Sequence, residues 1–337
     1  MKNGKLLIAF LLCCLTVQAQ DDVMTLRFMT YNIRHGAGMD DVIDLNRQAT
    51  VIGDATPDVV GLQEVDSCVK RSNRVHQAAV LAKSLGMYST FGPAIPLTGG
   101  KYGVAILSKE KPLSYHKIPL PGKEKRTLLV CEFEEYVFAC THLDLEETNR
   151  LTSLDIIMEE AARWDKPFFI CGDWNDEPSS TLITKMKKSF VFLNNTTSNS
   201  ANYTFPARTP NKIIDYIASY GRVVKSVRKR QVINEPEASD HRPVLIEIRM
   251  DSYTTPILSL AEDNSKFGVQ DSKSNAVYDL RGRKVNFQFS IFKAAIERGE
   301  NQTGLSSSER EQARTKFNSQ IKKKGLYIVN GRKVIYK

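Results

Sequence analysis

Between residues 24 and 249, short apolar segments alternate with amphipathic segments, and this order restricts the possible folds more than any other feature. Short apolar runs bounded by turn-forming residues are typical of strands, whereas an apolar repeat of three to four residues is typical of helices. The predicted strands are 25–33, 59–65, 103–107, 128–133, 136–141, 168–171, 213–217 and 244–248. The predicted helices are 45–55 (with Asp44 as its cap), 77–85, 150–164 and 181–187. Strands and helices mixed in this way favour a layered α/β fold around one core.

The N-terminal residues have the composition of a targeting segment. Two lysines precede an apolar run at 6–17, and Gln18-Ala19-Gln20 follows it, which predicts a secretory signal peptide over residues 1–20. The run is short for a bilayer span, and no later stretch is long and apolar enough for one. We therefore expect an exported protein that is periplasmic, on the cell surface or secreted. A lipid anchor on Cys13 or Cys14 is a less favoured alternative, because no small residues precede them as a lipoprotein site requires.

Four cysteines follow the predicted signal peptide. Cys131, Cys140 and Cys171 lie in apolar strand-like runs and are expected to be free and buried. No two cysteines have the spacing of a thiolate metal site. Because export would permit disulfides, pairing that includes Cys68 stays open.

The positive charge of the chain lies outside the α/β segment. Residues 21–250 hold 29 Lys and Arg against 29 Asp and Glu, whereas residues 251–337 hold 16 against 9, and the net charge of the whole chain is +9. Binding to duplex nucleic acid depends on many phosphate contacts from Lys and Arg. Nucleic acid is therefore a possible partner but not the favoured one, and the basic run at 222–230 is interpreted as a solvated strand edge or loop.

The C-terminal 87 residues differ in character from the preceding segment. Residues 251–275 are polar and rich in turn formers, as in a linker. Strand-like pieces follow at 275–280, 326–329 and 332–336, and Asn-Gly between the last two predicts a hairpin. We expect 251–337 to be a linker and a small, basic, β-rich tail. The pieces at 277–284 and 324–333 resemble the C-terminal sorting-type β module of exported Bacteroidetes proteins, although about forty residues separate them.

Polar residues end or follow six of the apolar runs, and one such residue alone could be a cap or a turn. Gly172-Asp173-Trp174-Asn175 is the most informative case, because side chains two residues apart on an extended segment share a face. Asp173 and Asn175 would then face a cleft, while Trp174 faces the opposite side and packs. The other candidates are Asn32, Glu64, His142, Asp144, Asp215, Asp240 and His241. Six such sites in one chain indicate a shared cleft.

The ordered motifs resemble the endonuclease/exonuclease/phosphatase superfamily over residues 25–250. They read Thr-Tyr-Asn-Ile at 30–33, Leu-Gln-Glu-Val at 62–65, Thr-His-Leu-Asp at 141–144, Gly-Asp-Trp-Asn at 172–175, Ile-Asp-Tyr-Ile at 214–217 and Ser-Asp-His at 239–241. The resemblance implies a catalytic domain over 21–250 with a four-layered α/β sandwich fold, in which two packed mixed sheets are flanked by helices. It also implies a hydrolase of phosphate esters that depends on Mg²⁺, which Mn²⁺ can replace.

The resemblance also implies a role for each polar residue. Glu64 is the expected principal Mg²⁺ ligand, and Asp240 would complete the metal shell. Asn32 would help to hold either the metal shell or the phosphate. His241 is the expected general base, with Asp215 fixing its tautomer. Asp173 would position the attacking water or hold a second metal, Asn175 would bind a phosphate oxygen, and His142 would stabilise the phosphoryl oxygens or assist the leaving group.

Weaker candidates for substrate contact are Arg71, Tyr102, Arg126 and Asp144, each weighed against an ordinary surface or packing role. Val104 stands where relatives often carry an amide, which puts a phosphate contact there in doubt. The favoured hypothesis is a monomeric, exported phosphoesterase acting on a phosphorylated small molecule or lipid head group. The alternatives are a secreted Mg²⁺-dependent nuclease and a catalytically silent binding protein on the same fold.

Overall fold

The structure, a computed structural model, describes residues 23–252, 277–278, 284–285, 325–329 and 332–336. The predicted signal peptide and nearly all of the predicted linker lie outside these residues. The chain divides into two units, Met1–Pro256 and Ile257–Lys337.

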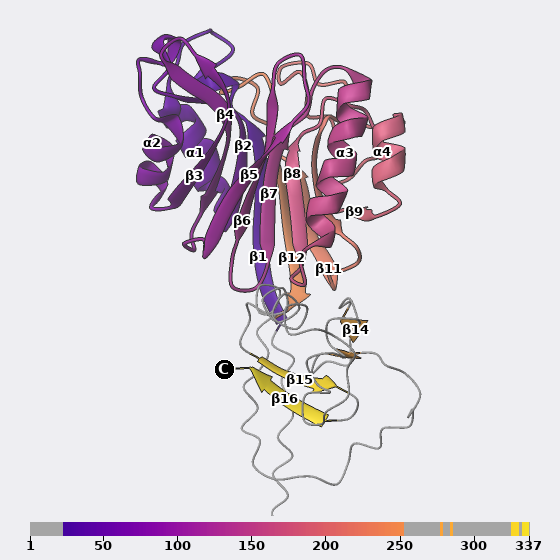
Figure 1. The fold of residues 1–337 in the computed structure, drawn as a ribbon. Helices are drawn as coiled ribbons and strands as arrows, with labels where there is room; N and C mark the ends of the chain where they lie inside the picture. The colour runs from indigo at the N-terminus through magenta and orange to yellow at the C-terminus, as the bar shows by residue number, and fades with distance from the viewer. Residues whose placement is uncertain (1–22, 253–276, 279–283, 286–324, 330–331, 337) are drawn as a thin grey trace, which may run out of the picture. The chain divides into compact units, whose positions relative to one another are not determined.

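Two six-stranded sheets form the first unit (Figure 1). The first has the order β11-β12-β1-β2-β4-β3, with β1 (Val23–Asn32), β2 (Val59–Ser67), β3 (Tyr88–Leu97), β4 (Gly100–Ser108), β11 (Ser226–Val232) and β12 (Val244–Asp251). The second has the order β5-β6-β7-β8-β10-β9, with β5 (Ser114–Leu120), β6 (Arg126–Glu132), β7 (Val137–His142), β8 (Phe168–Asp173), β9 (Phe190–Phe192) and β10 (Asp215–Tyr220). The pairs β1–β2 and β7–β8 are parallel, and the other pairs are antiparallel, so both sheets are mixed.

Three buried hydrophobic clusters show how the layers are stacked. One cluster joins the first sheet to α1 (Leu45–Ala55) and α2 (Gln77–Leu85), and a second joins the other sheet to α3 (Glu147–Ala162) and α4 (Thr181–Met186). The third contains residues of both sheets, so the sheets pack face to face between the helix pairs. The predicted four-layered α/β sandwich is confirmed.

Strand β8 shows why these apolar runs form buried strands. Phe168 and Ile170 belong to the helix-facing cluster, whereas Phe169 and Cys171 belong to the cluster between the sheets. A strand covered on both faces must be apolar at every position, which explains a continuous apolar run in place of an alternating one. Between the sheets, Phe28 of β1 contacts Phe169 with ring centroids 4.8 Å apart.

A glycine on β2 lets the two sheets approach each other closely. A Cβ atom on Gly61 would lie 2.1 Å from Cys171 Sγ and 3.0 Å from Cys140 Sγ. These two cysteines and Cys131 are free and buried, as expected, whereas Cys68 is free and exposed.

Helices α1 and α2 have the predicted bounds, and Asp44 Oδ1 accepts a hydrogen bond from the amide of Asn46 at 3.0 Å. Helix α3 begins at Glu147 and ends at Ala162, which is three residues earlier and two residues earlier than predicted. Strands β3, β5, β9 and β11 were not among the predicted strands. All four lie at sheet edges: β3 and β5 contain proline, β11 is largely solvated, and β9 (Phe-Val-Phe) is only three residues long, so none has the extended apolar run of a central strand. Strand β11 fits the interpretation of the basic run at 222–230 as a solvated strand edge.

The described residues of the second unit form four short strands in the order β14-β13-β15-β16. They are β13 (Val277–Tyr278), β14 (Lys284–Val285), β15 (Gly325–Val329) and β16 (Arg332–Tyr336). Strands β15 and β16 pair antiparallel with Val329 opposite Arg332, as the hairpin prediction requires. The resemblance to a sorting-type module stays a prediction. Among the helices of the described residues, none has the length and apolar character needed to cross a membrane.

Candidate active site

The topology brings the predicted site residues together at one end of the strands of both sheets. The parallel strands β1, β7 and β8 end there in Asn32, His142 and Asp173, and the antiparallel strands β6 and β10 begin there with Arg126 and Asp215. In the strand register, Asp173 lies opposite both His142 and Asp215. Polar residues from separate parts of the sequence are therefore neighbours.

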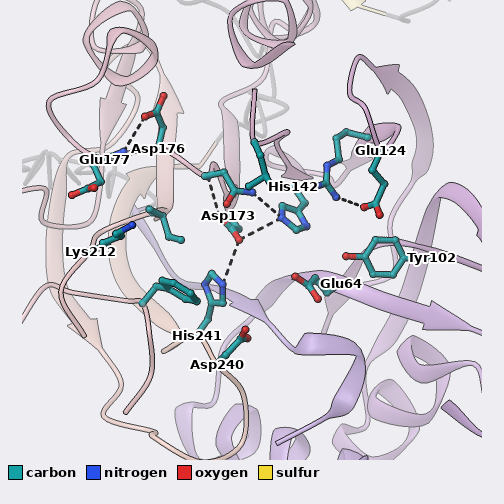
Figure 2. Close-up of a pocket in the computed structure, with 15 residues that line it drawn as sticks. Glu64, Tyr102, Glu124, His142, Asp173, Asp176, Glu177, Lys212, Asp240 and His241 are labelled. Atoms are coloured by element: carbon teal, nitrogen blue, oxygen red, sulfur yellow. Dashed lines mark hydrogen bonds and ion pairs between the residues drawn. The ribbon is translucent and has the colours of Figure 1, made fainter. Parts of the chain in front are cut away.

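A cavity of about 620 Å³ lies at this end of the strands (Figure 2). Its lining includes eight of the predicted site residues and several others that were not among them. The lining is Glu64, Tyr102, Glu124, Arg126, His142, Leu145, Asp173, Asn175, Asp176, Glu177, Phe205, Lys212, Ile214, Asp240 and His241. Asn32 and Asp215 lie behind this lining and hydrogen-bond to it.

An irregularity in β2 directs Glu64 into the cavity. The β2–β4 register shifts between Leu62 and Val65, and Glu64 has a φ of 57°. A bulge redirects a side chain that would otherwise lie on a sheet face, and non-glycine residues adopt positive φ at some cost in free energy. Asn32 Nδ2 donates to Glu64 Oε1 at 3.2 Å, and His35 Nδ1 lies 4.0 Å from Oε2. Burial opposes ionisation of Glu64, but these two neighbours and His142 outweigh it and lower its pKa to about 2.

His241 is held by a buried carboxylate. Its Nδ1 lies 3.0 Å from Asp215 Oδ2 and 3.2 Å from Oδ1, and Asp215 is 1% exposed. The ring of Phe205 packs against the imidazole with centroids 4.7 Å apart. A hydrogen on Nδ1 therefore faces Asp215, and Nε2 points away from that carboxylate, 3.5 Å from Asp173 Oδ2. Burial disfavours the charged imidazolium, but Asp215 and Asp173 raise the pKa of His241 to about 10.

Asp173 lies at the centre of the hydrogen-bond network (Figure 2). Its Oδ2 accepts from Asn32 Nδ2 at 3.1 Å and lies 3.5 Å from His142 Nε2, and its Oδ1 accepts from the amide of Asn175 at 3.0 Å. Complete burial, with a further contribution from the charge of Asp215, raises the pKa of Asp173 to about 7.

Asn175 and His142 form the next part of the network. Asn175 has a φ of 50°, and its Nδ2 donates to the carbonyl of Leu143 at 3.0 Å and lies 3.0 Å from His142 Nε2. Burial, then the charge of Arg126, lowers the pKa of His142 to about 3, so this imidazole is neutral at ordinary pH. Nε2 then accepts from the Asn175 amide, and Nδ1 carries the ring hydrogen.

The donor atoms near Glu64 fit a hard divalent cation. Glu64 and Asp240 both line the cavity, and their closest ion-pair contacts among the described residues are long, 4.0 Å to His35 and 3.9 Å to Arg34 Nε. Carboxylate oxygens are the ligands that Mg²⁺ prefers. Asn32 Oδ1 accepts from the backbone amide of Arg34 at 3.1 Å, so the Asn32 side chain orients two carboxylates through its amide hydrogens. Its predicted role as a ligand stays a prediction.

A second group of possible ligands consists of Asp173, Asp215 and His241, which offer ligand atoms all within 4.8 Å of one another. This group could hold a cation as well. However, the contact between Asp215 and His241 already uses one atom of each residue. Within the described part of the chain, the oxygens of Glu64 and Asp240 make no such short contact with a cationic group, so they are the better-fitting pair.

The weaker substrate-contact candidates divide into two pairs. Tyr102 and Arg126 line the cavity, whereas Arg71 and Asp144 do not. Arg71 forms two hydrogen bonds to the buried Asp66, at 2.9 and 3.0 Å, and its guanidinium lies 5.4 Å from the Tyr102 ring centroid. Asp144 accepts from the Lys123 amide and from Asn149 Nδ2, so it joins the β5–β6 connection to α3. Both residues therefore support the walls of the cavity.

Some of the unpredicted lining residues had a signal in the sequence, and others did not. Asp176 and Glu177 continue the acidic run after Asn175, while Glu124 and Lys212 lie in polar loops that give no pattern. Trp174 is fully buried against Tyr216, with ring centroids 4.9 Å apart, in agreement with its predicted packing role.

Comparison with known proteins identifies similar sequences and folds. A sequence profile of the Endonuclease/Exonuclease/phosphatase family matches residues 29–241. No curated protein sequence matches the chain. A solved endonuclease/exonuclease/phosphatase from Beutenbergia cavernae is 22% identical, with a TM-score of 0.56 over 67% of this chain and 72% of that one.

Two further structures carry named activities. A mannosyl-6-phosphatase from Bacteroides thetaiotaomicron is 18% identical, with a TM-score of 0.52 over 66% of this chain and 99% of that one. ANGEL2, a 2',3'-cyclic phosphatase in complex with adenosine-2',3'-vanadate, is 15% identical, with a TM-score of 0.52 over 68% and 96%. At these identities the similarity establishes a shared fold.

Proposed function

The chain belongs to the endonuclease/exonuclease/phosphatase family, and we propose that it is an exported, Mg²⁺-dependent phosphoesterase. Its substrate would be a phosphomonoester or phosphodiester of a small molecule or lipid head group. The observation that carries this proposal is the cavity in which the Asp215–His241 pair, Asp173 and the carboxylates of Glu64 and Asp240 meet. Export rests on the predicted signal peptide alone.

The carboxylates of Glu64 and Asp240 would hold the cation, with Asn32 orienting Glu64 through its amide. When bound there, a divalent cation supplies Lewis-acid stabilisation of the charge that develops on the phosphate. Asn175 and His142 lie on the other side of Asp173 and would contact the phosphoryl oxygens. This arrangement provides fixed polar groups around one phosphate, as transition-state stabilisation requires.

His241 is the proposed general base, because Nε2 lies beside Asp173 at the cavity while Nδ1 is fixed by Asp215. A base must be unprotonated to accept a proton. With its pKa near 10, His241 of the protein alone carries a proton at neutral pH. The base role therefore requires that positive charge in the occupied cavity offset the surrounding carboxylates and lower this pKa.

The charge of the cavity lining favours a small substrate over a nucleic acid. Two basic residues, Arg126 and Lys212, and the protonated His241 are outnumbered by carboxylates, namely Glu64, Glu124, Asp173, Asp176, Glu177 and Asp240. A polyanion that extended over these carboxylates would be repelled, whereas a single phosphate on a neutral alcohol or sugar would not. One of the solved proteins with this fold is a mannosyl-6-phosphatase, and a sugar phosphate belongs to this class of substrate.

A substrate panel tests the proposal. The purified protein is assayed with Mg²⁺ and with EDTA against sugar phosphates, inositol phosphates, sphingomyelin and plasmid DNA. We expect hydrolysis of a small phosphate ester that EDTA abolishes and that Glu64→Gln and His241→Gln each reduce by about 10²-fold or more. Full activity in His241→Gln would rule out the base assignment, and preferential cleavage of plasmid DNA would favour the nuclease alternative. Glu159→Gln, an exposed carboxylate on α3, is the control.

Localisation is tested separately. Cells that express the full chain should contain the protein outside the cytoplasm, whereas a chain without residues 1–20 should remain inside. Equal retention of both forms would contradict export.

A further inference from the structure

Among the residues that the structure describes, two buried hydrogen-bond donors without partners lie in the cavity wall beside His142. Arg126, the first residue of β6, is 8% exposed, and His142 is 7% exposed. Within the described residues, Arg126 Nε and His142 Nδ1 are buried atoms with no hydrogen-bond partner. A buried donor that is left unpaired costs about 1–3 kcal/mol. Two of them in one wall of a cavity indicate that this wall binds a ligand with acceptor oxygens.

The guanidinium of Arg126 pairs with one carboxylate of the described residues, Glu124, which also lines the cavity. Arg126 Nη1 donates to Glu124 Oε1 at 2.6 Å, and both residues line the cavity. The Glu124 side chain is 45% exposed, in contrast to the buried arginine. Figure 2 shows Glu124, Tyr102 and His142 on the same side of the cavity.

We propose that Arg126 and His142 form an anion subsite, and that Glu124 occupies the charged hydrogen bond of this subsite until a phosphate displaces it. The inference rests on the proposed phosphoesterase function and adds a selectivity to it. A carboxylate and a phosphate present similar pairs of oxygens to a guanidinium, so either can satisfy Arg126.

The surroundings determine which partner moves. Arg126 is fixed at the start of a strand and is buried, whereas Glu124 lies on the connection between β5 and β6 and reaches solvent. The adjacent Lys123 amide donates to Asp144 Oδ2 at 3.3 Å, which ties the connection to the neighbouring loop. Displacement thus requires only rotation of the Glu124 side chain into water.

A competing carboxylate discriminates between substrates by charge. A phosphomonoester dianion carries one more negative charge than a diester, and so competes more effectively for the guanidinium. Glu124 would weaken the binding of both anions but exclude the diester more. The structure therefore favours phosphomonoesters as the substrate class of this cavity.

Inorganic phosphate is the probe that tests this exchange without turnover. Its dissociation constant is measured by calorimetry at pH 8 with Mg²⁺ for the wild-type protein, Glu124→Gln, Glu124→Asp and Glu159→Gln. Glu159 pairs with Arg163 at 2.8 Å on the exposed face of α3 and serves as the matched control. We expect Glu124→Gln to bind phosphate about threefold tighter or more, Glu124→Asp to lie between, and the control to be unchanged.

A double variant and a second measurement complete the test. The gain in affinity should disappear in Glu124→Gln combined with Arg126→Gln, because the guanidinium is then absent. In thermal unfolding, phosphate should raise the melting temperature of Glu124→Gln by more than that of the wild type.

Phosphate affinity that is unchanged or weaker in Glu124→Gln would overturn the inference, because Glu124 would then orient Arg126 and not compete with the ligand. That outcome, with hydrolysis of phosphate esters retained, would leave the proposed function intact. If phosphate bound to neither the wild type nor Glu124→Gln, both the inference and the proposed function would be overturned.

Discussion

Replacing Asp215 with Asn should make the stability of the metal-free protein depend less on pH. Asp215 and His241 form a buried pair, with His241 Nδ1 3.0 Å from Asp215 Oδ2. At an effective dielectric constant of about 20, unit charges at this distance attract by about 5–6 kcal/mol. The pKa of His241 rises from 6.5 to about 10, which corresponds to about 5 kcal/mol. Because Asp173 and Asp240 share in this shift, we expect Asp215→Asn to lower the pKa of His241 from about 10 towards its ordinary value of 6.5 without reaching it.

The sign of the effect follows from the raised pKa. A histidine whose pKa is higher in the folded state stabilises the fold fully below pH 6.5, and the stabilisation is lost as pH rises through about 10. Breaking a buried ion pair costs about 3–5 kcal/mol. At pH 6, Asp215→Asn should therefore lower the free energy of unfolding by that amount. At pH 10 the difference in the free energy of unfolding between the wild type and Asp215→Asn should decrease towards about 1 kcal/mol, the value of a neutral hydrogen bond.

Urea unfolding in EDTA at pH 6, 8 and 10 measures this difference, and NMR of the His241 ring gives its pKa. Asp176→Asn is the matched control, because Asp176 loses a contact of 3.0 Å to an arginine, Arg150, and not to a histidine. Its destabilisation should be the same at all three pH values. If the destabilisation by Asp215→Asn were also the same at all three pH values, the electrostatic account of the pair would be refuted.

Three further predictions concern the core and the site. Gly61→Ala should lower the free energy of unfolding by about 1–3 kcal/mol, because its Cβ would lie 2.1 Å from Cys171 Sγ; adding Cys171→Ala should restore part of the loss in urea unfolding. Phe28→Ala should cost about 3–5 kcal/mol in the same assay, since this ring is fully buried against other aromatic rings between the sheets; a loss below 1 kcal/mol would contradict tight packing there. Asn175→Gly should keep or slightly raise the melting temperature, because glycine accepts a φ of 50°, yet it should lower the hydrolysis rate through loss of the amide at His142; unchanged hydrolysis would argue against phosphate contact.

The apolar runs predicted the central strands because those strands are covered on both faces. β7 and β8 supply residues to the inter-sheet core and to the helix-facing core at alternate positions, so their sequences leave little room for a polar residue. β3 and β5 lie at sheet edges, where solvent reaches one face and where proline is tolerated. Their pairing depends on a neighbouring strand that the local sequence does not specify.

The site was predictable to the extent that its residues are tied to strand ends. Asn32, His142 and Asp173 are the last residues of their strands, and the carboxyl ends of parallel strands meet at one edge. Glu124 and Lys212 gave no signal, because they lie on connections between strands. Whether such a residue lines a cavity depends on the path of the connection, which tertiary contacts such as the Lys123 amide to Asp144 determine.

The two histidines of the site show how one cavity can keep two identical side chains in opposite protonation states. His142 and His241 are both almost fully buried, and both contact Asp173 Oδ2 at 3.5 Å. The difference lies in their other partners: His241 faces the carboxylate of Asp215, whereas the charge of Arg126 acts on His142. The first partner favours an added proton and the second disfavours it. A positive charge introduced near Glu64 would act on His241 far more than on His142, since His142 is already neutral. The number of protons bound in the site can therefore change by one at His241, while His142 keeps the hydrogen on Nδ1 that it can donate to an anion.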